Sequence, residues 1–140
     1  IAPSFYWLIY PGFYGILELL KTPGLVRIHQ EETMVVRVAD KHPQEVAPGI
    51  IRSVLSHGAH LMLVEFSLKK GARVEAHSHP HEQITYVVRG TLFLNIDERT
   101  VVLAAGETCL IPSGSVHAAE AFSECLVVDT FSPPREDFLQ

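Results

Sequence analysis

Sulfur ligands and cross-links are scarce in this sequence. Only two of its 140 residues are cysteines, Cys109 and Cys125, and each lies in an apolar run. They form no C-x-x-C pair, so neither a zinc–thiolate site nor a dithiol redox site is expected. We interpret both as buried free thiols. A disulfide between them is the alternative, and it depends on a geometry that the sequence does not contain.

Clusters of positive charge are also missing. Eleven Lys and Arg residues stand against 16 Asp and Glu, which gives a formal net charge of −5 at pH 7. The only adjacent basic pair is Lys69-Lys70, and a solvated turn explains it. Nucleic-acid-binding domains carry a basic face or stripe. We therefore expect no nucleic-acid partner.

No apolar run is long enough to suggest a membrane span. Residues 1–20 are apolar apart from Glu18, but prolines and glycines interrupt them, whereas a span needs about 20 mostly apolar residues. A signal peptide has a positively charged N-terminal region and a cleavage site of small residues, and the sequence shows neither. We expect no membrane partner and a cytoplasmic location. Residues 1–44 are interpreted as an apolar arm that packs on the domain or on a second subunit, or as partly tag-derived.

What the sequence does contain is a series of short β-prone segments separated by turn residues. A length of 140 residues fits one domain, and a parallel α/β fold would need helical crossovers for which there is no room. We therefore expect an all-β sandwich or barrel in residues 45–140. Residues 42–49 form a Pro-rich connection, and only residues 15–21 look helical. The predicted strands are 33–39, 50–55, 61–68, 83–89, 91–96, 101–103, 108–111 and 126–131.

Histidines crowd into the stretch HSHPHEQ, which begins at His77. Side chains alternate faces along a strand, so His77 and His79 would point the same way and reach one ion. The chain then bends at a proline and returns at Gln83. His117 is the candidate for a third imidazole ligand. We place His81 at the rim of such a site. The alternative is a set of core or surface histidines that holds no metal.

Two longer patterns around these histidines resemble the two motifs of the cupin superfamily. The run 71–90 has a glycine, five residues, HxH, three residues, Gln83, six residues and a glycine, and the run 106–117 has a glycine, five residues, PxG, two residues and His117. Gln83 departs from the usual Glu, and Ala121 departs from a frequent Asn. The resemblance implies a single jelly-roll β-barrel that holds a metal through His77, His79, Gln83 and His117.

The segments HSHPHEQITYVVRG and DTFSPPREDFL resemble, more narrowly, the small pectin-degradation cupins of the KdgF type. The likeness runs from about residue 45 to 139 and leaves the first forty-odd residues uncovered. It implies ring opening of 4,5-unsaturated uronates, a divalent ion (Ni, Zn, Mn, Fe or Co) and an anionic sugar-acid substrate. It also implies a Gln ligand, Asp129 as acid/base and Arg135 as the substrate-carboxylate clamp. Strand alternation places Phe131 on the same face as Asp129, where it could form the wall against the sugar ring.

Each of these last three residues also has a structural interpretation. Asp129 could cap a turn, Arg135 could pair with Glu136 or Asp137, and Phe131 could be core. Two other functions stay open: an oxygen-using metal enzyme, and a non-enzymatic module that binds a metal or a small anion. An amide ligand is less typical of iron oxygenases, which use a carboxylate. We also expect a homodimer, because an apolar arm suits exchange across a two-fold axis.

Overall fold

The computed structural model describes residues 35–140, so the helix expected at 15–21 and most of the predicted arm lie outside the described residues. The strands are β1 (Gln44–Ala47), β2 (Ile50–His57), β3 (Met62–Leu68), β4 (Arg73–His77), β5 (Glu82–Arg89), β6 (Thr91–Ile96), β7 (Arg99–Ala104), β8 (Thr108–Ile111), β9 (His117–Ala121) and β10 (Cys125–Ser132). Two 3₁₀ turns, η2 (Val38–Asp40) and η3 (Glu136–Leu139), complete the described elements.

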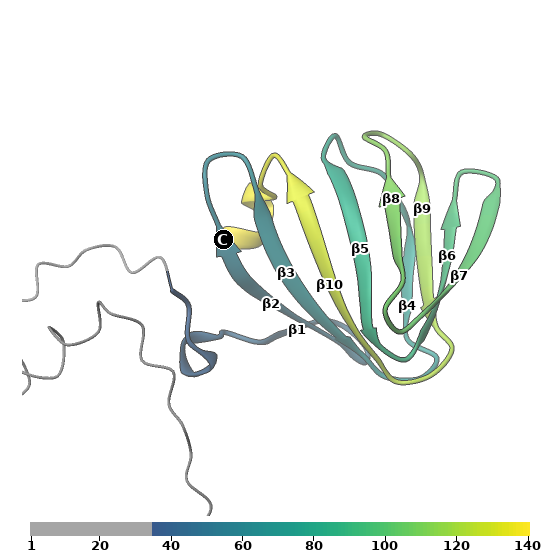
Figure 1. Cartoon of the computed structure of the whole chain (residues 1–140), viewed down its shortest axis with the longest axis horizontal. Helices are drawn as coiled ribbons and strands as arrows, with labels where there is room; N and C mark the ends of the chain where they lie inside the picture. The colour runs from purple at the N-terminus through teal and green to yellow at the C-terminus, as the bar shows by residue number, and fades with distance from the viewer. Residues whose placement is uncertain (1–34) are drawn as a thin grey trace, which may run out of the picture. The chain divides into compact units, whose positions relative to one another are not determined.

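The strands form two antiparallel sheets, as expected for a jelly-roll barrel (Figure 1). The six-stranded sheet has the order β1-β2-β3-β10-β5-β8, and the four-stranded sheet has the order β4-β9-β6-β7. The C-terminal turn η3 lies beside the ends of β2, β3 and β10 (Figure 1). Segments distant in sequence therefore meet at this end of the domain.

The core follows the alternation of side chains along the strands. In β10, every second residue is buried: Cys125, Val127, Asp129 and Phe131. The neighbouring strand β5 shows the same pattern, with two polar members at its start, Gln83 and Thr85. Because apolar residues fill the inner positions elsewhere, buried polar side chains at this end of the barrel stand out as unusual.

Two segments differ from the sequence prediction. Residues 35–39 of the predicted strand 33–39 form no strand, and η2 occupies Val38–Asp40. Val35 and Val38 are strongly exposed, so their β propensity meets no partner strand against which to pack. Conversely, the predicted connection 42–49 contains β1, which pairs with β2. Its flanking prolines are tolerated because β1 is an edge strand.

The list of predicted strands also lacked β4 and β9, although His77 was placed on a strand. These strands, with the sequences RVEAH and HAAEA, contain few β-branched residues, so their β propensity is weak. They pair with each other, and His77 lies directly opposite His117 in their register. Strands β6 and β7 form an antiparallel hairpin in which Ile96 lies opposite Arg99. Among the described residues, no helix is long and apolar enough to cross a membrane.

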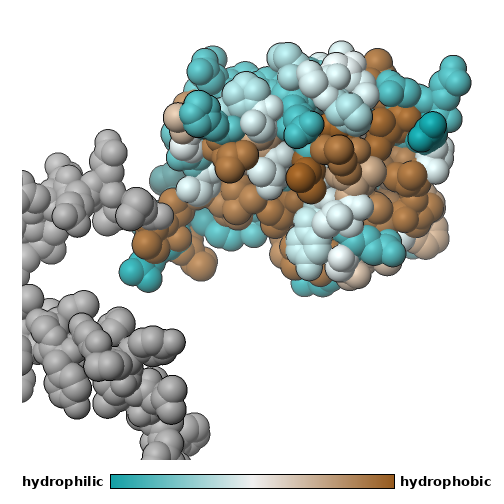
Figure 2. All heavy atoms as spheres, turned by 45° about the horizontal axis from the view of Figure 1, so that its top comes forward, coloured by the Kyte–Doolittle hydropathy of each residue, from teal (hydrophilic) through white to brown (hydrophobic). Residues whose placement is uncertain are grey.

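Apolar residues are also exposed on the outer side of the six-stranded sheet. Leu63, Ile84 and Leu110 lie in one cross-strand row with Thr130, which joins β3, β10, β5 and β8. Figure 2 shows apolar residues gathered over the middle of the face that it presents. Exposed apolar surface of this kind suits a subunit interface. The expected homodimer stays a prediction, and a monomeric mass in solution would contradict it.

The turn between β5 and β6 gives a test of the fold. Gly90 has φ of +94°, and a Cβ there would overlap the carbonyl oxygen of Glu124 and lie 2.8 Å from Sγ of Cys125. We expect Gly90→Ala to lower the free energy of unfolding by about 3 kcal/mol, because it adds a clash to backbone strain. Chemical denaturation followed by circular dichroism measures this value.

Gly106→Ala is the matched control. Gly106 has φ of +90°, but no heavy atom lies within 4 Å of its Cβ position. This variant therefore introduces only strain, and we expect a loss of about 1 kcal/mol. Equal losses for the two variants would contradict the close packing described at Gly90.

Candidate metal centre and cavity

Three imidazoles meet at one end of the barrel. His77 ends β4 and His117 begins β9, and the antiparallel register places them opposite each other with ring centroids 4.3 Å apart. His79 follows in the next loop, and its ring centroid lies 4.9 Å from that of His117. One nitrogen from each ring lies within 4.8 Å of the others. The structure therefore brings together the three histidines that the sequence predicted as metal ligands.

His79 reaches this cluster by a route that differs from the prediction. Strand β4 ends at His77, so strand alternation does not orient His79. Instead, the loop of the second motif holds it. The backbone N–H of Gly114 donates to the carbonyl oxygen of His79 (2.9 Å), and Ser113 Oγ donates to that of Pro80 (2.6 Å). Gly114 has φ of +79°, which explains the glycine of the PxG pattern.

The tautomers of the three rings follow from their backbone contacts. A carbonyl oxygen only accepts hydrogen bonds, so each Nδ1 must carry the proton, and each neutral ring then has its lone pair on Nε2. The three Nδ1 atoms donate to backbone oxygens as follows: His77 to Glu75 (2.9 Å), His79 to His81 (3.1 Å) and His117 to Ser115 (2.9 Å). His117 Nε2 is buried and has no hydrogen-bond partner among the described residues.

Gln83 adds an oxygen to the same cluster. Its Nε2 donates to Thr85 Oγ1 (3.1 Å) and to Asp129 Oδ2 (3.0 Å). This fixes the amide so that Oε1 lies 3.1 Å from Nε2 of His79. In the tautomer set by the backbone, both facing atoms carry lone pairs, which repel each other unless a cation or a second imidazole proton lies between them.

Electrostatics disfavour that second proton. Burial, reinforced by the charge of Arg135 and by His117, lowers the pKa of His79 below its usual 6.5. Burial also lowers the pKa of His117. Metal ions bind neutral imidazoles, so the state that the surroundings favour is the one needed for coordination. Three imidazole nitrogens and one amide oxygen thus form a donor set that fits a divalent transition metal.

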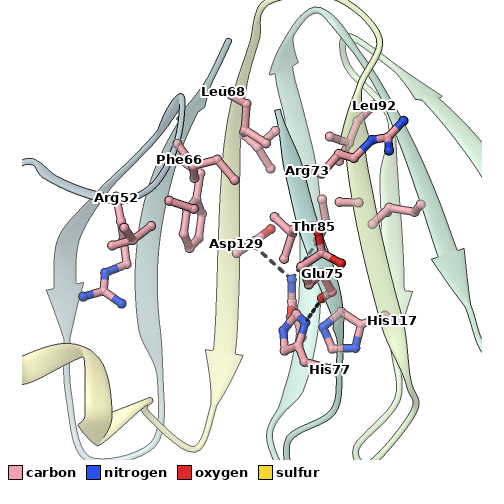
Figure 3. Close-up of a pocket in the computed structure, with 18 of the residues that line it drawn as sticks. Arg52, Phe66, Leu68, Arg73, Glu75, His77, Thr85, Leu92, His117 and Asp129 are labelled. Carbon is pink, nitrogen blue, oxygen red and sulfur yellow. Dashed lines mark hydrogen bonds between the residues drawn. The ribbon is translucent and has the colours of Figure 1, made fainter. Parts of the chain in front are cut away.

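The cluster borders a cavity of about 440 Å³ between the two sheets (Figure 3). Its volume is in the range of small-molecule sites. All other lining residues are apolar, and the polar or charged side chains are Arg52, Arg73, Glu75, His77, Gln83, Thr85, His117, Asp129 and Arg135. The predicted site residues line this cavity apart from His79, which lies in the adjoining cluster.

Asp129 is the buried carboxyl group of the cavity. Its β10 position lies directly opposite Thr85 of β5, and Figure 3 shows it facing the histidine cluster. Burial raises the pKa of Asp129 from 3.8 to about 7, although hydrogen bonding to Thr85 and Gln83 favours the charged form. Oδ1 has no hydrogen-bond partner among the described residues. The interpretation of Asp129 as a turn cap therefore does not describe its surroundings.

Phe131 and Arg135 combine structural contacts with a place in the cavity wall. Phe131 is 2% exposed and packs with Met62 and Val64, while its ring also lies 5.7 Å from that of His79. Arg135 lines the cavity and makes the ion pair with Asp137 that was considered as an alternative. The structural and the functional interpretations are thus compatible for both residues.

Several cavity residues were not assigned from the sequence. Thr85 could have been found, because it lies two residues after Gln83 on the same face of a strand. Phe66 and Phe138 look like ordinary core residues, and no spacing singles them out. Arg52 also lies in the cavity wall.

Comparisons with known proteins agree with this geometry. A family model described as "Cupin domain" matches residues 64–131. The pectin degradation protein KdgF of Dickeya dadantii is 32% identical over 105 residues, which cover 73% of this chain and 96% of that protein. Among solved structures, KdgF from Halomonas sp. is 33% identical, with a TM-score of 0.71 over 74% of this chain and 96% of the other.

A second solved structure is also similar to this chain in both fold and sequence. An RmlC-like cupin from Shewanella frigidimarina is 34% identical and has a TM-score of 0.71, over 74% of this chain and 94% of that one. Both cupin motifs, the two-sheet barrel and the histidine cluster are present in the described residues. The chain therefore belongs to the cupin superfamily and, within it, to the family of KdgF-type proteins.

Proposed function

We propose that this protein opens the ring of 4,5-unsaturated uronates, the sugar acids released from pectin or alginate, in a reaction that depends on a divalent metal. The observation that carries the proposal is the position of Asp129. A carboxyl group with a pKa of about 7 lies beside three convergent imidazoles and hydrogen-bonds Gln83. The similarity to proteins named for pectin degradation supports the choice of substrate class.

The proposed reaction is an isomerisation in which protons move but no atom is lost. The substrate has a double bond between C4 and C5, and its ring oxygen joins C5 to C1. As the C1 hydroxyl loses its proton, the bond from C1 to the ring oxygen breaks, which leaves an aldehyde at C1 and an enolate at C5. Transfer of a proton to C4 then converts the enolate to a ketone. One group that accepts and donates a proton near neutral pH can serve both steps.

Asp129 has the properties of that group. Its pKa of about 7 allows both protonation states near neutral pH. Oδ2 accepts the hydrogen bond from Gln83, whereas Oδ1 is free of partners among the described residues. We assign the proton transfers to Oδ1. The hydrogen bond on Oδ2 would keep the carboxyl group oriented during both transfers.

His77, His79, His117 and Gln83 would hold the metal through three Nε2 atoms and one amide oxygen. When bound there, a divalent ion such as Ni, Zn, Mn, Fe or Co supplies Lewis-acid polarisation of substrate oxygens. Arg135 would bind the substrate carboxylate, because a planar guanidinium matches a planar carboxylate. Phe131 would support the sugar ring from the buried wall of the cavity.

Metal removal tests whether the proposed reaction depends on a divalent ion. Purified protein should accelerate the loss of the ultraviolet absorbance of 4,5-unsaturated galacturonate above the spontaneous rate. A chelator should abolish that acceleration, and added divalent metal should restore it. Fully metal-loaded protein that gives no acceleration would contradict the proposed reaction, while leaving the cupin fold unaffected.

The second prediction separates catalysis from metal binding. Asp129→Asn should retain the metal but lower kcat by about 10²- to 10⁴-fold, because the amide cannot transfer the proton. His117→Ala should lose both metal and turnover. Elemental analysis of the purified variants measures the metal, and the ultraviolet assay measures turnover. Glu82→Gln is the control, since Glu82 is exposed on the same strand as Gln83. Normal turnover by Asp129→Asn would refute the role of Asp129.

The third prediction concerns the amide ligand. Gln83→Glu should bind the metal more tightly, because an anionic ligand replaces a neutral one. It should also reduce turnover by at least about tenfold, since the carboxylate cannot donate to Asp129 Oδ2 and its charge would favour protonated Asp129. Metal titration and the ultraviolet assay measure the two effects. Unchanged turnover together with tighter metal binding would show that the donor from Gln83 is not needed.

A further inference from the structure

The guanidinium of Arg135 is held by a residue that the proposed reaction does not use. Arg135 Nε donates to Asp137 Oδ1 (2.9 Å), and Arg135 Nη2 donates to Asp137 Oδ2 (2.7 Å). Two parallel hydrogen bonds of this kind fix both the position and the plane of a guanidinium. The Arg135 side chain is 14% exposed and lines the cavity, whereas that of Asp137 is 56% exposed.

The pairing with Asp137 uses only some of the N–H donors of the Arg135 guanidinium. Asp137 occupies the edge formed by Nε and Nη2, while Nη1 has no hydrogen-bond partner among the described residues. A guanidinium has five N–H donors, so the groups on Nη1 can still bind a second anion. An isolated arginine side chain would need to lose considerable rotational freedom before it could bind a substrate in one geometry.

Aromatic contacts also fix the position of the segment that contains Arg135 and Asp137. The Phe138 ring, in η3, lies with its centroid 4.2 Å from Cζ of Arg135 and 4.1 Å from Cζ of Arg52. It also makes edge contacts with the rings of Phe131 (5.7 Å) and Phe66 (6.5 Å). These contacts place η3, which contains Asp137, against the cavity wall.

We propose that Asp137 is a positioning residue, which orients Arg135 so that its remaining donors face the carboxylate of the substrate. The proposal rests on the proposed function, because it assigns the substrate carboxylate to Arg135. It extends that function by including the C-terminal turn in the recognition of the anion.

The contribution of Asp137 is to orientation rather than to stability. Ion pairs with a strongly exposed member contribute little to folding. The hydrogen bonds from Arg135 lower the pKa of Asp137, so its carboxylate stays charged throughout the neutral range. A competing interpretation is that Asp137 occupies the place of the substrate carboxylate and inhibits binding. The two interpretations predict opposite changes in KM when the charge of Asp137 is removed.

The test compares three variants in the metal-loaded, full-length protein. Asp137→Asn should raise KM for 4,5-unsaturated galacturonate about tenfold, because charge-assisted hydrogen bonds to Arg135 are lost. It should leave kcat within about twofold and the melting temperature within about 2 °C. Asp137→Glu should recover part of the affinity. Glu136→Gln is the matched control, since Glu136 is an exposed neighbour in the same turn and is not part of the cavity wall.

A binding measurement separates this inference from the proposed reaction. Calorimetry with saturated galacturonate, which cannot undergo the reaction, should show the same loss of affinity in Asp137→Asn and none in Glu136→Gln. The methyl ester of galacturonate should bind the wild type and Asp137→Asn equally, because it lacks the carboxylate. If the wild type binds galacturonate in this pattern but opens no ring, only the proposed reaction fails. An unchanged or lower KM and dissociation constant in Asp137→Asn would overturn the positioning role.

Discussion

The antiparallel register of two strand pairs determines the site. Pairing of β4 with β9 sets His77 opposite His117, and pairing of β5 with β10 sets Thr85 opposite Asp129. A shift of one residue in either pair would turn these side chains to the other face of the sheet. Register is strongly specified here because one face of each sheet packs into a common core. The chemistry of the cavity thus depends on the same hydrophobic burial that forms the barrel.

Gln83 connects the two halves of the site through one rigid amide. Its nitrogen donates to Thr85 and Asp129 while its oxygen faces the histidines, so turning the amide would break both donated hydrogen bonds. For Asp129, a pKa of about 7 in place of 3.8 means that the surroundings as a whole, chiefly burial, disfavour the ionised form by on the order of 4 kcal/mol. A second anion at position 83 would add to this cost. A neutral side chain at position 83 is therefore favoured by the buried carboxyl group of Asp129.

Sequence and structure agree best where several weak signals coincide. Most strands were predicted because segments rich in Val, Ile, Leu and Phe recur with turn residues between them. The limits of β6 and β8 match the predicted ones. The strands β4 and β9 were missed, since their stability comes from pairing and burial rather than from intrinsic propensity. The histidine cluster was still predicted, because it was recognised from the spacing of the histidines in the two motifs and not from the strands that carry them. The hold of the Gly114 loop on His79 depends on contacts distant in sequence and was not predictable.

The site has two parts that depend on different contacts. The two motif loops, held together by hydrogen bonds such as that from Gly114 to His79, place the imidazoles. The part of the cavity wall that we propose to bind the substrate carboxylate comes from one continuous stretch, in which strand β10 orients Asp129 and Phe131 and the following turn supports Arg135 on Phe138. Because β10 also pairs with β5, Gln83 is the point where the two parts meet. We therefore expect changes in the C-terminal turn to alter the proposed anion binding without disturbing the histidines, and changes at Gln83 to affect both parts.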